Sequence, residues 1–195
     1  MKVDLIKTFE IVAPAETAWD LLQDIPKVAS CMPGAVIDTK VDESHYSGMV
    51  KAKIGPATMA FNGGINVASI DVDKFEIHMI GSGQDTKGTS AAEMDLTVNI
   101  VGVDDDNCQL VGNARVTVNG KAASLGGRML TQVADQILNQ FGKNFNTNVA
   151  AMGEGSQAEE AQQVVEQQPR ELNALAFAWS VFIGWISSFF FSKQK

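Results

Sequence analysis

The 195-residue chain has few basic residues, and they are not clustered. It contains 15 Lys and Arg against 23 Asp and Glu, which gives a formal net charge of −8. The densest basic stretch is Lys-Ala-Lys at residues 51–53. Proteins that bind nucleic acid neutralise phosphates with clustered Lys and Arg. We therefore expect no nucleic-acid partner.

Cysteine is scarce, and the N-terminus does not have the features of a leader. The two cysteines, Cys31 and Cys108, do not make a disulfide framework. Cys31 fits a buried structural thiol better than a nucleophile. Residues 1–12 contain acidic residues and lack the long apolar core of a signal peptide. We expect the folded part to stay in the cytoplasm.

The sequence also lacks a catalytic or metal-binding motif. His45 and His78 fall on different predicted strands without a partner, and a metal site needs three or four convergent ligands. The glycine-rich stretch 120–128 lacks the spacing of a phosphate-binding loop. The acidic run 104–106 is typical of a solvated turn. We therefore predict no catalytic residue, no metal and no covalently bound cofactor. If the protein were an enzyme, Tyr46, the only inward polar aromatic residue, would be the residue to test.

Apolar and polar residues alternate over several short stretches, which is the pattern of half-buried strands. Pro14 begins a short helix that includes Trp19, and Pro26 interrupts it. From about residue 35 to 119 the pattern predicts consecutive strands separated by turn residues, and such an order favours an antiparallel sheet with one solvated face. The individual predicted strands cover residues 3–12, 45–54, 59–67, 75–79, 94–100 and 110–118.

From Ala122 the spacing of apolar residues changes to every third or fourth position. This spacing predicts one amphipathic helix of more than twenty residues. The helix has only the apolar face of the sheet against which to bury its stripe, so residues 1–150 are predicted to form one α+β domain. The stripe consists of Leu125, Met129, Leu130, Val133, Ile137, Phe141 and Phe145.

Beyond residue 150 the composition changes twice. Residues 151–172 are rich in Glu and Gln and contain no aromatic residue, as in a flexible, disordered linker. Residues 174–191 contain no charge, and a run of about 18 apolar residues is the usual threshold for a membrane-spanning helix. We therefore predict that residues 173–195 form a hydrophobic tail helix that associates with the membrane, through Trp179, Phe182, Trp185, Phe189, Phe190 and Phe191.

The arrangement of this tail stays open. Lys193 and Lys195 follow the apolar run, and positive charge favours the cytoplasmic side of a membrane. A spanning helix would place both lysines on the other side. The alternatives are a shallow or re-entrant insertion, or docking on the chain's own domain or on a partner protein. We predict a location at the cytoplasmic face of the cell membrane.

Three segments in this order resemble the G-subunit family of carbon monoxide dehydrogenase. They are IPKVASCMPGA at residues 25–35, YSGMVKAKIGPATMAFNG at residues 46–63 and VNGKAASLGGRMLTQVADQI at residues 118–137. The family belongs to the START-like, helix-grip SRPBCC superfamily, and the resemblance covers residues 1–149. It implies a curved antiparallel β-sheet wrapped around a long C-terminal helix, with an elongated apolar cavity between them.

The resemblance also implies a function. Members of the family accompany molybdenum hydroxylases such as aerobic carbon monoxide dehydrogenase, with roles in recruiting that enzyme to the membrane, in its assembly, and in carrying a quinone. We expect a non-enzymatic carrier whose cargo is a quinone, menaquinone or ubiquinone, or a similar membrane lipid. The alternative is an adaptor or assembly factor that recruits the enzyme to the membrane without carrying a ligand.

The predicted inner face is rich in methionine and small residues. Methionine is flexible and polarisable, which suits contact with a variable apolar ligand, but it also serves as core filler. Small residues such as Gly63 and Gly81 leave room either for a ligand or for a closely packed helix, and both alternatives stay open. The residues expected to line a cavity are Tyr46, Met49, Met59, Phe61, Phe75, Ile77, Met79, Met94, Leu96, Val116, Leu125, Met129, Val133 and Ile137.

Overall fold

The computed structural model describes residues 1–54 and 57–153 of the chain. The predicted tail with its six aromatic residues, and the predicted linker beyond residue 153, lie outside the described residues. Within those residues, no helix is both long and apolar enough to cross a bilayer. The elements in chain order are β1 (Lys2–Ile11), α1 (Ala15–Gln23), α2 (Ile25–Cys31), β2 (Ala35–Lys40), β3 (His45–Ile54), β4 (Ala57–Asp71), β5 (Glu76–Asp85), β6 (Ser90–Gly102), β7 (Cys108–Gly120), the 3-10 helix η1 (Lys121–Leu125) and α3 (Gly127–Ala150).

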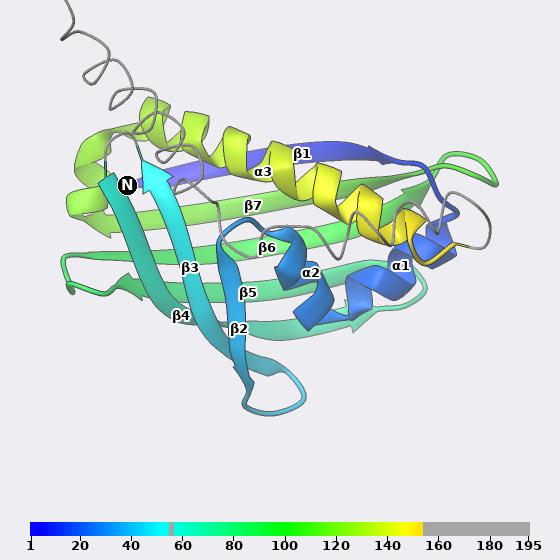
Figure 1. The fold of residues 1–195 in the computed structure, drawn as a ribbon, viewed down its shortest axis with the longest axis horizontal. Coiled ribbons are helices and arrows are strands. Elements are labelled where there is room, and N and C mark those ends of the chain that lie inside the picture. Colours follow the sequence, from blue (N-terminus) through cyan, green and yellow to red (C-terminus); the bar gives the residue numbers. More distant parts are fainter. Residues whose placement is uncertain (55–56, 154–195) are drawn as a thin grey trace, which may run out of the picture.

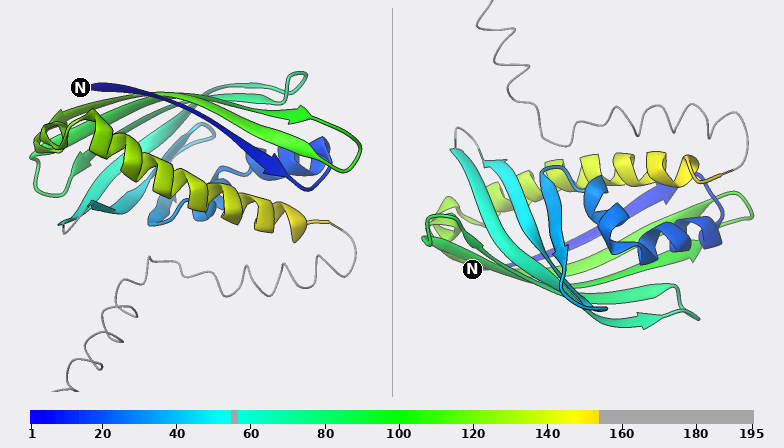
Figure 2. Two further views of the ribbon diagram at one scale, coloured as in Figure 1. Left: turned by 90° about the horizontal axis from the view of Figure 1, so that it is seen from above. Right: turned by 60° about the horizontal axis from the view of Figure 1, so that its bottom comes forward.

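The strands form one antiparallel sheet of seven, in the order β1-β7-β6-β5-β4-β3-β2. Strands β2 to β7 form a meander, because each strand pairs antiparallel with the next one in the chain. The N-terminal strand β1 pairs with β7, at the opposite edge from β2. The sheet curves around one side of α3 (Figures 1 and 2). The predicted α+β helix-grip architecture of the folded part is confirmed.

A row of small residues crosses the most strongly curled part of the sheet. Gly48 pairs with Gly63, Gly63 pairs with Gly83, and Gly83 pairs with Ala92. A Cβ atom on Gly63 would overlap the carbonyl oxygen of Ser82 on the neighbouring strand. The row therefore allows a close approach of backbones that a side chain would prevent. Strands β2, β3 and β4 turn toward α2 in this part of the sheet (Figure 2).

The two short helices close one end of the concave face. Helix α1 buries Trp19, whose ring stacks on Phe75 with centroids 5.3 Å apart. Asp24 then caps α2 by accepting a hydrogen bond from the Lys27 amide at 3.1 Å. Pro26 lies in the first turn of α2, where its missing amide hydrogen costs nothing. Pro26 therefore marks the start of the second helix.

Helix α3 runs along the edge strand β1 (Figure 1). Lys7 of β1 forms an ion pair with Asp135 of α3 at 2.8 Å, and the Val12 amide donates to the Asn146 side chain at 3.1 Å. The sequence predicted a helix from Ala122. The structure instead places η1 first, and Gly126, with φ of 81°, separates η1 from α3. Only glycine adopts this φ readily, so the change of direction occurs there.

Candidate ligand cavity

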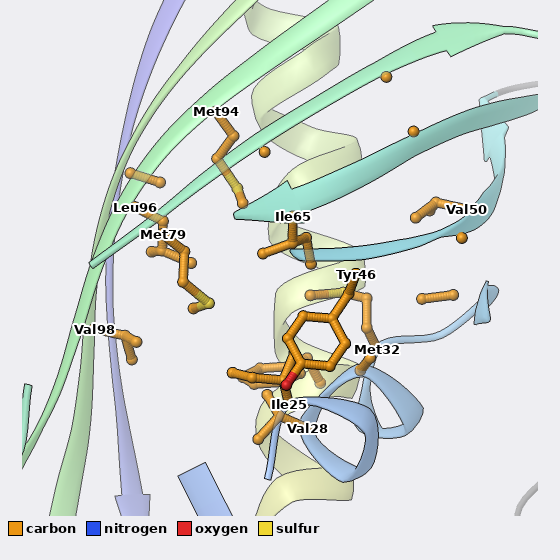
Figure 3. Close-up of a pocket in the computed structure, with 18 of the residues that line it drawn as sticks. Ile25, Val28, Met32, Tyr46, Val50, Ile65, Met79, Met94, Leu96 and Val98 are labelled. Atoms are coloured by element: carbon orange, nitrogen blue, oxygen red, sulfur yellow. The ribbon is translucent and has the colours of Figure 1, made fainter. Parts of the chain in front are cut away.

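A cavity of about 480 Å³ lies between the concave face of the sheet and helices α2 and α3 (Figure 3). Its wall is formed almost entirely by apolar side chains and glycines. The polar residues along it are Lys7, Tyr46, Ser82 and Glu93. Ser82 and Glu93 are exposed and alternate with inward residues of β5 and β6, so their side chains lie on the outer face. Among the described residues, Lys7 and Tyr46 are thus the two polar side chains on the cavity side.

The cavity is closed at one end and open at the other. Toward α1, the inner face of the sheet is fully packed, since Ile77 and Leu110 are 0% and 1% exposed. At the other end, Val50 lies on the inner side of β3 and is still 39% exposed. Its register partner Phe61 is only half-buried. The mouth therefore lies beside Val50 and Phe61, and a ligand inside would extend from there toward α1.

Half of the residues predicted to line a cavity are found along its wall. They come from five strands of the sheet, and their role as ligand contacts stays a prediction. Met49 borders the cavity, but it alternates with the inward residues Gly48 and Val50, so its side chain belongs to the other face of β3. The residues found along the wall are Tyr46, Met49, Phe61, Met79, Met94, Leu96 and Val116.

The other predicted residues lie elsewhere. Ile77 is part of the closed core, and Phe75 stacks on Trp19. Helix α3 reaches the cavity with Leu138 and Phe141. The earlier part of the helical stripe is only half-buried and does not line the cavity, because α3 lies beside the edge strand β1 and not over the centre of the sheet. The predicted residues absent from the wall are Met59, Phe75, Ile77, Leu125, Met129, Val133 and Ile137.

The small residues of the inner face surround open space. The sequence left two explanations for them, room for a ligand or a closely packed helix. Gly48, Gly63, Gly81, Ala92 and Ala114 all line the cavity. On Gly112, also in the wall, an added Cβ would have its nearest contact at 3.9 Å, with Leu96. At Gly112 the missing side chain therefore leaves open room in the cavity, whereas at Gly48 and Gly63 a Cβ atom would meet the backbone of the neighbouring strand.

Sequence reasoning missed the contribution of α2. Ile25, Val28, Ala29 and Met32 line the cavity from this side (Figure 3). Their spacing of three and four residues is the signal of one helical face, and it was available in the sequence. The interruption predicted at Pro26 does not account for this face.

Lys7 was also missed. It alternates with the inward residues Leu5 and Phe9 on β1, although it is charged. Its ammonium group pairs with Asp135 at 2.8 Å, and the two side chains are 29% and 43% exposed. An ion pair of this exposure contributes about 0.2–1 kcal/mol to stability. A charged residue in the inward phase of a strand was the available signal.

Tyr46 is the second polar side chain of the wall, and it is 8% exposed. The Lys40 ammonium group lies 5.9 Å from the centre of its ring, in cation–π contact, and pairs with Glu43 at 3.1 Å. The hydroxyl group makes no hydrogen bond to any residue within 1–54 or 57–153. Figure 3 shows the oxygen pointing toward Ile25 and Val28 of α2.

The remaining reactive side chains lie outside the cavity wall. Burial raises the pKa of the Cys31 thiol to about 12, and burial together with the charge of Glu16 raises the pKa of Cys108. Both thiols are therefore protonated and unreactive near neutral pH. His45 and His78 pair with exposed aspartates, each at 2.8 Å. In the described part of the chain, no three His, Cys, Asp or Glu residues are arranged to hold a metal ion.

Solved structures share this architecture. A conserved protein from Geobacillus kaustophilus superposes with a TM-score of 0.69 and 21% identity, over 76% of this chain and 95% of that chain. A START superfamily protein from Mycobacterium smegmatis superposes with a TM-score of 0.52 and 19% identity, over 77% of this chain and 99% of that chain. The Zhui aromatase/cyclase from Streptomyces sp. R1128 superposes with a TM-score of 0.58 and 13% identity, over 76% of this chain and 94% of that chain. At these identities the likeness shows the fold alone, a START-like helix-grip domain.

The family is shown by the sequence itself. The model of the carbon monoxide dehydrogenase G-subunit family (CoxG) matches residues 8–150, so the chain belongs to this family. No curated protein matches the sequence. The fold neighbours include both a START superfamily protein and an aromatase/cyclase. The fold therefore fits a ligand-binding domain but does not separate a carrier from an enzyme.

Proposed function

We propose that the protein is a non-enzymatic carrier that binds a quinone or a similar lipid in the apolar cavity. It delivers this cargo between the membrane and a molybdenum hydroxylase of the carbon monoxide dehydrogenase type. The observation that supports the proposal best is the cavity itself, about 480 Å³ with one closed end and an almost wholly apolar wall. This volume falls within the range of about 300–1,000 Å³ that small-molecule sites occupy.

The chemistry of the wall suits a quinone or lipid better than a polar substrate. A molecule with a long apolar part gains about 25 cal/mol for each Å² that it removes from water, without needing polar contacts. Methionines Met79 and Met94 adapt to ligands of different shape. An opening beside the exposed Val50 would let the ring enter while a long tail extends outward.

The cavity offers little to a chemical reaction. General acid–base catalysis needs a titratable group within hydrogen-bonding reach of the reacting atom. Lys7 is already paired with Asp135, and Glu93 lies on the outer face of the sheet. Tyr46 is the remaining polar group, and its hydroxyl group can donate a hydrogen bond to a ligand. These features favour a carrier over an enzyme.

The proposed membrane association rests on the uncharged stretch 174–191. The proposed partner enzyme rests on membership of the carbon monoxide dehydrogenase G-subunit family. Deletion of residues 172–195 should move the protein, and the partner enzyme with it, from the membrane fraction to the soluble fraction. If the full-length protein is already in the soluble fraction, the proposed membrane association of the tail is wrong. If the partner enzyme never fractionates with the full-length protein, delivery to that enzyme is wrong.

Native mass spectrometry of the full-length protein tests the cargo directly. The Gly112→Val variant places two methyl groups in the cavity, where the nearest contact of a Cβ is 3.9 Å. The Gly102→Val variant is the matched control, since it changes an exposed glycine outside the cavity whose Cβ would contact only Ala15, at 3.8 Å. We expect wild type and Gly102→Val to retain a copurified or added quinone, and Gly112→Val to lose most of it.

Two results would contradict the carrier function. If wild-type protein binds no quinone or lipid, the cavity carries no such cargo, and the adaptor or assembly role is favoured. If Gly112→Val binds as well as wild type, the ligand occupies another place. Circular dichroism of each variant checks that the fold is retained.

A further inference from the structure

The Tyr46 hydroxyl group is a polar atom in apolar surroundings that the protein leaves without a partner. The side chain is only 8% exposed, yet no described residue forms a hydrogen bond with the hydroxyl group. Polar groups inside folded proteins are almost always paired, because leaving one unpaired is unfavourable. Among the described residues, no fully buried side-chain oxygen or nitrogen lacks a partner, so the Tyr46 oxygen is accessible, and a ligand in the cavity can replace water on it.

The position of the ring is fixed by its neighbours. Tyr46 pairs with Ile65 across β3 and β4, and its buried ring lies under the Lys40 ammonium group, which pairs with Glu43 at the surface. The hydroxyl group is thus directed at the face of α2 that carries Ile25 and Val28 (Figure 3). The donor is therefore held in place before a ligand arrives, and the ring does not have to reorganise.

The other polar side chain of the wall does not compete for this role. The Lys7 ammonium group is engaged by Asp135 at 2.8 Å and lies at the β1 edge, across the sheet from Tyr46. All other side chains that the described residues place on the cavity side are apolar or absent. Within this part of the chain, the cavity thus has one polar side chain, Tyr46, that forms no hydrogen bond, in an otherwise apolar wall.

We propose that Tyr46 is the residue that selects and orients the cargo, by donating a hydrogen bond to a carbonyl oxygen of the ligand. The cargo is then an apolar molecule with a carbonyl group at one end, a quinone ring being the form that fits the proposed function on which this inference rests. The carbonyl end lies between Tyr46 and α2, and the apolar tail extends past the glycine row toward Val50 at the mouth. A pure hydrocarbon of the same size gains nothing from Tyr46.

Two small probes of the same shape separate this contact from general apolar binding. Menadione is a naphthoquinone with two ring carbonyls, and in trimethylnaphthalene methyl groups replace the two carbonyl oxygens. Both are titrated calorimetrically into the full-length protein kept in solution with amphipol. The Tyr46→Phe variant removes only the hydroxyl group and keeps the ring under Lys40. The loss of one hydrogen bond predicts about five- to tenfold weaker binding of menadione, with unchanged affinity for trimethylnaphthalene.

A spectroscopic measurement reports on the hydrogen bond itself. The infrared carbonyl stretch of bound menadione should lie at lower frequency in wild type than in Tyr46→Phe. The Lys7→Met variant should preserve this lower frequency, because Lys7 is not the donor. Ligand-free Tyr46→Phe should unfold at about the same temperature as wild type, because the accessible hydroxyl group forms no hydrogen bond with a described residue.

The outcomes distinguish the two proposals. If wild type binds neither probe, the carrier function fails, and this inference fails with it. If wild type binds both probes but Tyr46→Phe weakens both equally or neither, the carrier function stands and the role of Tyr46 is wrong. If the carbonyl shift is lost in Lys7→Met and retained in Tyr46→Phe, the donor is Lys7 and the proposal is overturned.

Discussion

The Phe9 ring of β1 occupies the space beside Gly142 of α3 where a Cβ atom would lie. The same ring contacts Phe141 edge to face, with centroids 6.1 Å apart. Gly142 is fully buried although it interrupts the apolar stripe of the helix. The glycine thus lets the helix approach the edge strand closely at one point, while Phe141 forms part of the cavity wall.

Replacing Gly142 with alanine should therefore destabilise the protein. In an unobstructed helix this change stabilises by about 1 kcal/mol. Here the added methyl group overlaps the Phe9 ring, and such overpacking costs about 1–3 kcal/mol. We expect a net loss of stability in urea unfolding. Phe9→Leu should reduce the cost of Gly142→Ala when the two are combined, and Asn139→Ala on the exposed face of α3 should be neutral or stabilising. A stabilising Gly142→Ala would show that the ring moves aside freely.

Gly63→Ala should destabilise the sheet more than Gly112→Ala does. The Cβ of residue 63 would overlap the Ser82 carbonyl oxygen and lie 2.7 Å from the Gly83 Cα, both backbone atoms that cannot rotate away. The cost is about 1–3 kcal/mol, as for other overpacked sites. At Gly112 the nearest contact is at 3.9 Å, which is ordinary packing. Urea unfolding of both variants makes the comparison, and equal costs would mean that the glycine row does not constrain the curl of the sheet.

Asp85 should support stability at neutral pH and lose this role in acid. Burial alone would raise its pKa, but hydrogen bonds from the Ser90 and Thr89 amides outweigh burial and lower the pKa below its usual value. A lowered pKa stabilises the fold above the ordinary value of 3.8, and the benefit disappears as the pH falls through the folded-state pKa. Asp85→Asn should lower the free energy of unfolding at pH 7 and flatten its decline in acid. The control variant Asp38→Asn, on the exposed side of β2, should leave the free energy of unfolding close to that of wild type.

Cys31 should make stability fall at high pH. Its pKa is raised from 9.0 to about 12 by burial, so the folded state holds the proton that the unfolded state releases. Its contribution is complete below pH 9 and is lost as the pH rises toward 12. Cys31→Ala should reduce this alkaline slope in urea unfolding, although the smaller side chain costs some stability at all pH values. In the native protein, alkylation of Cys31 at pH 8 should be as slow as global unfolding, and fast labelling would show that the thiol is accessible.

The alternation on β6 allowed its inner residues Met94 and Leu96 to be identified from sequence, because a strand with one buried face has a period of two. The same rule, strictly applied, identifies Lys7 and excludes Met49. At both residues the position on the strand decides the orientation, against the usual exposure of lysine and burial of methionine. For α3, the periodicity predicted the helix but not its position, because an apolar stripe does not say which strand it packs against.

The sequence by itself determined six of the seven strands, the long C-terminal helix, the antiparallel connections and the family, because these depend on local periodicity, turn residues and short motifs. It did not predict β2 (Ala35–Lys40) or α2 as a separate helix. Only the tertiary structure decided that β1 pairs with β7, that α3 lies along β1, and that the inner glycines border open space and not a helix. It also decided that the Tyr46 hydroxyl group has no partner among the described residues. These outcomes depend on pairings between residues far apart in the chain, which no local pattern encodes.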